Sequence, residues 1–197
     1  VPFFGRLASD PASRKLLLNV IETVPLPEAM AFQLTVARDV RPEIYINLVR
    51  TSMVAVWLAS RSNRVSRFDL GMAASAGLLH DIGKLGLPDD LLAKPFNALT
   101  PEQRALVMKH PVIGQNILMG IEKFKEAAIL VRHHHECYDG NGYPDHLAGI
   151  AIPQGSRILH VVNEYDSLLI GTQVQRALKR AEALNFLIEN RGKRYDP

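Results

Sequence analysis

The chain has 197 residues, of which 47% are hydrophobic and 22% charged, and its formal net charge is +3. This length and composition fit one globular domain with a sizeable core, or one domain and a small extension. The small, scattered excess of basic residues excludes a nucleic-acid polymer as the expected partner, although it suits a small anionic ligand. A single cysteine excludes an internal disulfide, and the lack of disulfides is typical of cytoplasmic proteins. No apolar run is long enough to span a bilayer.

The first 40 residues contain two predicted helices. A cap residue and Pro11 precede apolar residues at helical spacing over about 9–24, and a second helix is predicted over 27–40. We expect residues 1–40 to form a helical extension or linker ahead of a main domain at 41–197. Because the chain begins with Val1 rather than Met, we also expect it to be a fragment or a processed form that follows an upstream domain.

Helices are predicted along the rest of the chain as well. Helices are expected over 42–63, 68–82, 154–169 and 174–190, and further helices are expected to begin at 101, 111 and 124. The helix at 101 is preceded by Thr100 and has Gln103 in its first turn, which is the pattern of a capping box. No stretch alternates apolar and polar residues for long enough to predict a sheet, so we predict an all-α helical bundle. Two long irregular stretches, 84–99 and 136–152, each follow a cluster of titratable residues, which is where a site carried by loops is expected.

Histidines are concentrated beside one sharp break in the pattern. The chain contains His80, His110, His133, His134, His135, His146 and His160, and residues 132–144 read RHHHECYDGNGYP. Because successive side chains on a helix point about 100° apart, three consecutive histidines cannot share one direction. We therefore expect two metal ligands and one bystander. Gly140 and Gly142 indicate that the helix has ended there, and they allow the backbone to approach a ligand closely.

Further candidate ligands lie elsewhere in the sequence. The pair His80-Asp81 ends an apolar helix, and it offers a neutral nitrogen and a carboxylate that can bridge two ions. Such nitrogen and oxygen ligands suit Fe, Mn, Zn or Ni better than Ca or Mg. Any one of the histidines could be an ordinary residue held by a hydrogen bond. Their combination with Lys84 and with His110 before Pro111 nevertheless predicts a metal site.

Four segments together resemble the HD-GYP domain, a branch of the HD phosphohydrolase superfamily: HDIGK at 80–84, KHP at 109–111, HHE at 134–136 and DGNGYP at 139–144. The likeness is densest over about 42–169. It implies an all-α bundle with two long loops around a metal centre, and metal-dependent hydrolysis of cyclic di-GMP in bacterial signalling. It also implies that 41–197 is the catalytic-type domain and that 1–40 links it to an upstream receiver or sensor.

The resemblance implies a role for each ligand. Asp81 would bridge two ions, with His80 on one ion and His110, His134 and His135 on the other. Two ions a few ångströms apart can acidify a shared water and clamp a phosphodiester. Lys84 would meet the phosphate as a point charge, or would form a salt bridge instead.

Residues around the ligands are expected to support them. Glu136 and Asp139 could orient ligand imidazoles, although Asp139 could equally stabilise the DGNG bend as a turn residue. Gly142, Tyr143 and Pro144 would shape the loop beside the metals. The bystander histidines would be His133, His146 and His160.

Two ligand positions depart from the family pattern. No histidine precedes His80, and Asn47 stands where the family supplies one, four residues after Glu43, whose carboxylate could be an extra ligand. The D-x-x-D motif of the late helix reads NEYD, with Asn163 at the ligand position and Asp166 as the second acid. We therefore expect one well-held ion, Fe or Mn ahead of Zn or Ni, and a weak or empty second site.

Three functions stay open. The chain could be a cyclic di-GMP phosphodiesterase of low activity, or a degenerate domain that binds the nucleotide, or a partner such as a diguanylate cyclase, without catalysis. It could also be a phosphohydrolase of another nucleotide. The retained HDIGK, HHE and DGNGYP motifs favour the first function. Asn47 and Asn163 favour the second, as does LLIGTQVQ at 168–175, which replaces the arginine-proline-tyrosine segment that the family links to nucleotide binding. The amphipathic stretch 174–190 is expected to pack onto the domain, with a homodimer interface as the alternative.

Overall fold

The computed structural model describes residues 5, 7, 9–61, 67–171 and 176–197. Within these ranges the chain is helical without strands, and its one β-type contact is the bridge between Arg191 and Tyr195. The α-helices are α2 (Pro11–Ile21), α3 (Glu28–Val40), α4 (Pro42–Arg61), α5 (Arg67–Leu79), α6 (Asp89–Leu92), α7 (Pro101–Val107), α8 (His110–Met119), α9 (Lys125–Arg132), α10 (Gln154–Ile170) and α11 (Arg180–Glu189). The predicted all-α class is confirmed.

Local signals in the sequence set several helix starts. The Asp10 carboxylate accepts a hydrogen bond from the Ser13 N–H at the start of α2. At the start of α7, the Thr100 hydroxyl and the Gln103 side chain each bond the other residue's backbone, which is the predicted capping box. These bonds satisfy N–H groups that have no partner within a helix.

Several predicted boundaries differ from the observed ones. The first helix, predicted over 9–24, spans Pro11–Ile21. The helix predicted over 68–82 stops at Leu79 and continues as the 3-10 helix η1 (Ile82–Gly86). The irregular stretch 84–99 contains the short helix α6 and the 3-10 helix η2 (Phe96–Ala98). The last helix begins at Arg180, later than predicted, while residues 62–66 and 172–175 lie outside the described ranges.

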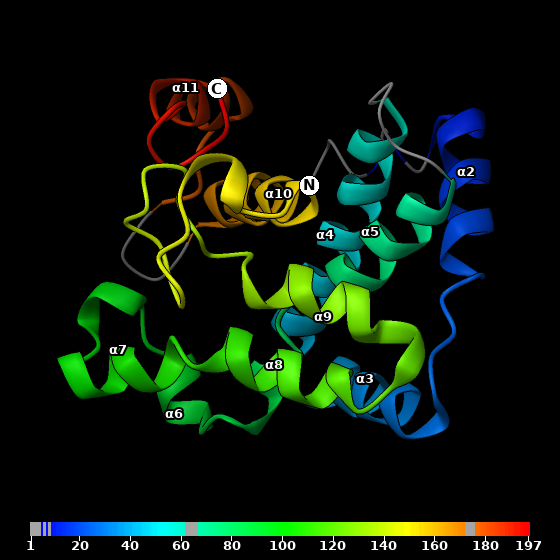
Figure 1. Cartoon of the computed structure of the whole chain (residues 1–197), viewed down its shortest axis with the longest axis horizontal. Coiled ribbons are helices and arrows are strands. Elements are labelled where there is room, and N and C mark those ends of the chain that lie inside the picture. Colours follow the sequence, from blue (N-terminus) through cyan, green and yellow to red (C-terminus); the bar gives the residue numbers. More distant parts are fainter. Residues whose placement is uncertain (1–4, 6, 8, 62–66, 172–175) are drawn as a thin grey trace.

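The core is built around α4 and α5, which pack side by side in the middle of the molecule (Figure 1). A Cβ on Gly77 of α5 would lie 2.6 Å from the Ser52 Cα of α4, so glycine is required for this close approach. Buried Leu48, Leu79 and Phe124 belong to one cluster that joins α4 and α5 to α9 and α10. His80 follows Leu79 directly, so the packing of α5 fixes where the HD pair begins.

The predicted N-terminal extension shares this core. Met30 and Leu34 of α3 lie in the same cluster as Leu48, and Leu17 of α2 packs with Val56 of α4. The division at residue 40 stays a prediction, but the two parts are not packed as separate units.

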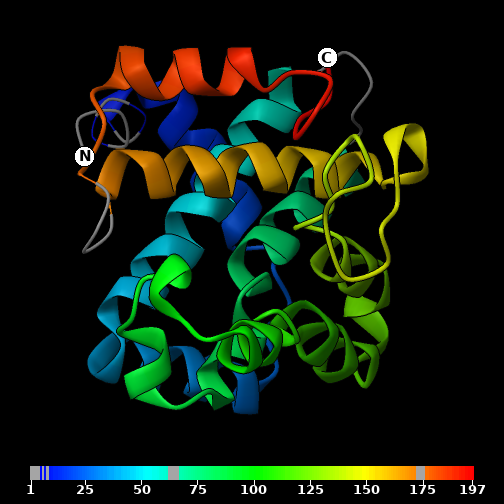
Figure 2. The ribbon, with the colours of Figure 1, turned by 90° about the vertical axis from the view of Figure 1, so that its left-hand side faces the viewer.

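The C-terminal end of the chain returns to the loop at 136–152. Helix α11 lies alongside α10, and the segment after it reaches that loop (Figure 2). The backbone N–H groups of Tyr138 and Asp139 donate to the carbonyls of Arg194 and Lys193, at 3.1 and 2.8 Å. None of the helices in the described ranges has the length and apolar character needed to cross a bilayer.

Candidate metal centre

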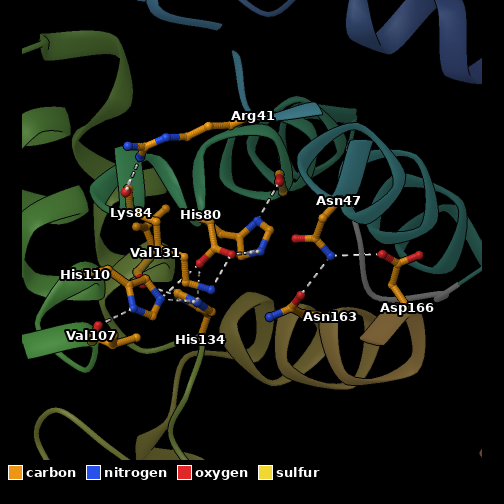
Figure 3. Close-up of polar contacts among 12 residues, drawn as sticks. Arg41, Asn47, His80, Lys84, Val107, His110, Val131, His134, Asn163 and Asp166 are labelled. Atoms are coloured by element: carbon orange, nitrogen blue, oxygen red, sulfur yellow. Dashed lines mark hydrogen bonds and ion pairs between the residues drawn. The ribbon is translucent and has the colours of Figure 1, made fainter. Parts of the chain in front are cut away.

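Four of the predicted ligands converge where several helices end. Asp81 follows α5, His110 begins α8, and His134 and His135 follow α9. Each of the four offers one ligand atom, and these atoms all lie within 4.8 Å of one another. Figure 3 shows the His110 and His134 rings turned toward each other. The four ligands predicted for one ion therefore come together from segments that are up to 54 residues apart along the chain.

Backbone carbonyls fix the orientation of three histidine rings. The Nδ1 atoms of His80, His110 and His134 lie 2.9, 2.7 and 2.6 Å from carbonyl oxygens three residues earlier. A carbonyl can only accept a hydrogen bond, so each Nδ1 carries the proton and each Nε2 presents a lone pair. Burial lowers the pKa of His80 and of His110 to about 4, so both rings are neutral near pH 7.

The lone pairs face one another in the interior of the protein. His110 Nε2 lies 3.4 Å from His134 Nε2 and 3.0 Å from Asp81 Oδ1. The Nε2 atoms of His80 and His135 are buried and have no hydrogen-bond partner among the described residues. Converging acceptors with no proton between them are costly unless a cation satisfies them. These residues therefore fit a metal ion.

Asp81 separates two groups of neighbours. Its Oδ1 faces His110 and His134, the latter at 3.7 Å, whereas its Oδ2 lies 3.5 Å from His80 Nε2 and 2.7 Å from Lys84 Nζ. Burial alone would raise the pKa of the Asp81 carboxyl, whereas the adjacent Lys84 ammonium favours the ionised form, and the resulting pKa is well below its usual range. The carboxylate is thus ionised and positioned between two potential cation sites.

The second potential site contains a hydrogen-bonded amide pair. Asn47 Nδ2 donates to Asn163 Oδ1 at 3.2 Å and to Asp166 Oδ2 at 2.9 Å (Figure 3). Asp166 is buried beside Arg50, with 3.6 Å between Oδ1 and Nη1. Asn47, Asn163 and Asp166 therefore already bind one another on the side of the centre near His80, and Glu43 lines the same cleft one turn before Asn47.

The DGNGYP loop folds back onto the histidine ligands. The Tyr143 ring stacks on the His135 ring with 4.8 Å between centroids and 19° between planes, and Tyr143 N–H donates to the His135 carbonyl at 3.2 Å. A Cβ on Gly142 would lie 2.2 Å from Cys137 N, so only glycine allows this contact. The Tyr143–Pro144 peptide bond is cis.

Glu136 and Asp139 contact the loop backbone instead of the ligand imidazoles. The buried Glu136 carboxylate accepts from the N–H groups of Asp145 and Leu147, at 2.7 and 3.2 Å. Asp139 accepts from the backbone N–H and the side chain of Asn141, which is the turn role that we gave as its alternative.

The predicted bystander histidines lie outside the four-ligand cluster. His133 Nδ1 lies 3.4 Å from Asp145 Oδ2, and Asp145 also forms an ion pair with Arg132. His160 Nδ1 donates to the Glu136 carbonyl at 2.7 Å, and the exposed His146 has a positive φ of 56°. His133, Glu136 and Asp145 form a second group with metal-ligand spacing, but Arg132 and backbone N–H groups already occupy its carboxylates.

The centre opens into a cleft of about 710 Å³. Asp81, His110, His135 and Tyr143 are among the residues that line it, together with the cationic side chains of Lys84, Lys94 and Arg194. This volume is in the range of small-molecule sites, so the cation site is reachable by an anionic ligand.

Sequence reasoning missed one residue that supports the HD segment. Arg41, directly after α3, donates to the carbonyls of Lys84, Leu85 and Leu87 at 2.9–3.1 Å. These bonds hold η1, the turn that carries Lys84, and Figure 3 shows the bond to the Lys84 carbonyl. Arg41 is the residue before Pro42, and nothing in the local pattern indicates a partner more than 40 positions away.

The fold and the site together define a helical domain with a histidine–aspartate cluster that fits a metal ion. A family model described as "HD domain" matches residues 33–197. The chain belongs to this HD domain family, and its HDIGK, HHE and DGNGYP motifs are the segments by which it resembles the HD-GYP branch.

Two curated relatives are similar over much of this chain. It is 37% identical over 152 residues to the cyclic di-GMP phosphodiesterase response regulator RpfG of Xanthomonas campestris pv. campestris, covering 76% of this chain and 40% of the relative. It is 35% identical over 146 residues to 3′3′-cGAMP-specific phosphodiesterase 3 of Vibrio cholerae, covering 73% of this chain and 32% of the relative. The chain thus spans less than half the length of either relative.

One solved structure shows the same fold. An HDG"Y"P protein from Bdellovibrio bacteriovorus aligns with a TM-score of 0.65 and 21% identity, covering 96% of this chain and 63% of that protein.

Proposed function

We propose that this chain is a metal-dependent phosphodiesterase that hydrolyses cyclic di-GMP in bacterial signalling. The observation that carries the proposal is the convergence of Asp81, His110, His134 and His135, three of which, Asp81, His110 and His135, line an accessible cleft. A carboxylate and three imidazoles suit Fe or Mn, with Zn or Ni as alternatives. The names of the relatives support a cyclic dinucleotide as the substrate.

The residues at and around the metal centre have distinct roles in the proposed hydrolysis. Asp81, His110, His134 and His135 hold the ion, which when bound lowers the pKa of water and offsets charge on phosphoryl oxygens. Lys84, which lies 2.7 Å from Asp81, provides a fixed positive charge for the substrate phosphate. Tyr143 keeps the His135 ring in place by stacking on it.

We further propose that the second ion binds weakly. His80 and Asp81 Oδ2 remain as its strong donors, whereas Asn163 Oδ1 already accepts a hydrogen bond from Asn47. Neutral amides bind a divalent ion less well than a carboxylate or an imidazole does. Weak occupancy of this site predicts slow turnover.

Metal analysis and a turnover assay test the proposal. The chain purified without oxygen should hold about one Fe or Mn ion per chain, and it should convert cyclic di-GMP to a linear product. Asp81→Asn should lose both the ion and the activity, whereas His146→Asn, a change at an exposed histidine, should lose neither. Absence of turnover in the metal-loaded chain would contradict the proposed function.

The weak second site has its own test. The double variant Asn47→His with Asn163→Asp should bind a second ion and raise turnover at least about tenfold, which corresponds to about 1.4 kcal/mol of barrier. Two tightly bound ions in the unmodified chain would contradict this part of the proposal.

The amide pair also favours a second candidate function. If Asn47, Asn163 and Asp166 keep their hydrogen bonds in place of an ion, the domain would bind a cyclic dinucleotide, or a partner such as a diguanylate cyclase, without hydrolysing it. Saturable binding of cyclic di-GMP with no turnover, even in the double variant, would favour this function.

A further inference from the structure

We propose that Arg194, in the C-terminal turn, is a substrate-positioning residue that binds the phosphodiester of the cyclic dinucleotide that is not being cleaved. This inference rests on the proposed substrate class. It is carried by the position of Arg194 in the cleft that holds the metal centre, although the two are far apart in the sequence.

The turn that carries Arg194 is fixed to the metal-centre loop. Gly192 N–H donates to the Tyr195 carbonyl at 2.8 Å, and the Arg194 carbonyl accepts from Tyr138 N–H at 3.1 Å. The buried Tyr195 ring packs edge-on against His160, with 5.1 Å between centroids. His160 in turn donates to the carbonyl of Glu136, the residue after His135. The position of Arg194 is therefore set relative to the ligand histidines.

The guanidinium itself is held from two sides. Its Nη2 donates to Glu164 Oε2 at 3.1 Å, and its Cζ lies 6.0 and 5.7 Å from the ring centres of Phe186 and Tyr195. The side chain is still 40% exposed. An arginine has five N–H donors, and Glu164 uses one Nη atom, so the fork can also bind a phosphate. Because these contacts already restrict the side chain, little flexibility is lost on binding.

The chemistry of a cyclic dinucleotide calls for such a cation. The ligand carries two phosphodiesters, and only one can occupy the metal centre during a cleavage step. The cleft presents Lys84, Lys94 and Arg194 as cationic side chains, and Lys84 is engaged with Asp81. The segment 167–175, which includes the stretch where related domains carry the arginine-proline-tyrosine segment, contains no lysine or arginine and so supplies no cation for this phosphate. Arg194 is thus the cleft cation that combines a fixed position with a planar fork suited to phosphate.

The test compares two substrates in the metal-loaded chain. Cyclic di-GMP has a second phosphodiester, whereas bis(p-nitrophenyl) phosphate has only the one that is cleaved. For Arg194→Ala we expect the KM for cyclic di-GMP to rise about tenfold, the loss expected for one charge-assisted contact at a partly exposed site. The rate with bis(p-nitrophenyl) phosphate and the metal content should stay unchanged. The KM of Arg194→Lys for cyclic di-GMP should lie between those of the unmodified chain and Arg194→Ala, because lysine keeps the positive charge but lacks the planar fork of donors.

Lys193→Ala is the matched control, since it changes a neighbouring cation on the same turn that does not line the cleft. An equal effect of Lys193→Ala, or an equal loss with both substrates, would show that the turn acts through folding or net charge, and it would overturn the inference. An unchanged KM for cyclic di-GMP in Arg194→Ala would overturn it as well.

Failure of the proposed hydrolysis can be distinguished from failure of this inference. If the unmodified chain cleaves neither substrate, calorimetric titration with cyclic di-GMP decides the role of Arg194. Binding that weakens about tenfold in Arg194→Ala and is unchanged in Lys193→Ala supports the inference. Equal affinities in the two variants, or no binding to the unmodified chain, overturn it.

Discussion

Gly142 illustrates how a single residue permits the geometry of the metal centre. The absence of a side chain lets the DGNGYP loop lie directly on the backbone of His135, Glu136 and Cys137. That contact places Tyr143 over the His135 ring. The sequence predicted that this glycine ends a helix and shapes a loop close to a ligand, and the structure shows that the close contact is with the backbone of a candidate ligand and its two neighbours.

A substitution at Gly142 should therefore affect both stability and metal binding. In Gly142→Ala the added Cβ would meet backbone atoms of residues 135–137 at 2.2–2.5 Å. We expect the free energy of unfolding to fall by about 1–3 kcal/mol, as for other overpacked sites, and the ion to bind more weakly. Thermal unfolding and metal titration would measure these changes. Gly86→Ala is the control, because nothing lies within 4 Å of its added Cβ; equal effects of the two variants would contradict the prediction.

At the scale of elements, the centre depends on short helices and turns that other parts of the chain hold. The 3-10 helix η1 carries Lys84 and follows Asp81, and Arg41 bonds three of the carbonyls in and after it. Arg41 also pairs with the exposed Asp89 at 2.7 Å. The end of α3 is thus part of the support of the HD segment.

Loss of Arg41 should loosen this turn. We expect Arg41→Ala to lower the free energy of unfolding by about 2–3 kcal/mol, because hydrogen bonds from a charged donor to half-buried carbonyls are lost. We also expect weaker metal binding through the displaced Lys84 and Asp81. Urea unfolding and metal titration would measure both effects. Arg38→Ala removes an exposed arginine from the last turn of α3 that forms an ion pair with its neighbour Asp39, and this variant should be nearly neutral. A comparable loss there would contradict the role of Arg41.

At the scale of the whole molecule, several buried histidines make stability depend on pH. Burial lowers the pKa of His80, His110 and His160 to about 4, whereas in the unfolded chain histidines titrate near 6.5. Between these values the unfolded state binds more protons than the folded state. The free energy of unfolding of the metal-free chain therefore rises with pH across this window.

Acidification should destabilise the metal-free chain accordingly. Its free energy of unfolding should be highest above about pH 6.5 and should fall by a few kcal/mol in total as the pH is lowered toward about 4. Urea unfolding of chelator-treated protein at pH 7 and pH 5 would measure the loss. His160→Gln should make the dependence less steep, because one fewer proton is taken up on unfolding. A free energy of unfolding that is equal at the two pH values would contradict the prediction.

The sequence predicted the molecule well where the signal is local. Helix class, the capping box at Thr100 and the grouping of candidate ligands follow from spacing and short motifs. The roles of Arg41 and Arg194 could not be predicted in this way, because each depends on partners 30 or more positions away. The actual contacts of Glu136 were also missed, since a carboxylate beside histidines gives no sign that it will bind backbone N–H groups.

The carbonyl bonds to His80, His110 and His134 have a consequence for how the centre is loaded. Ring direction is set by the ends of the protein's own helices, so the donors are arranged before any cation arrives. Chelation should then empty the pocket while circular dichroism stays constant, and different divalent ions should exchange within one folded scaffold. The ion bound in a cell would then depend more on which metals are available there than on the geometry of the site.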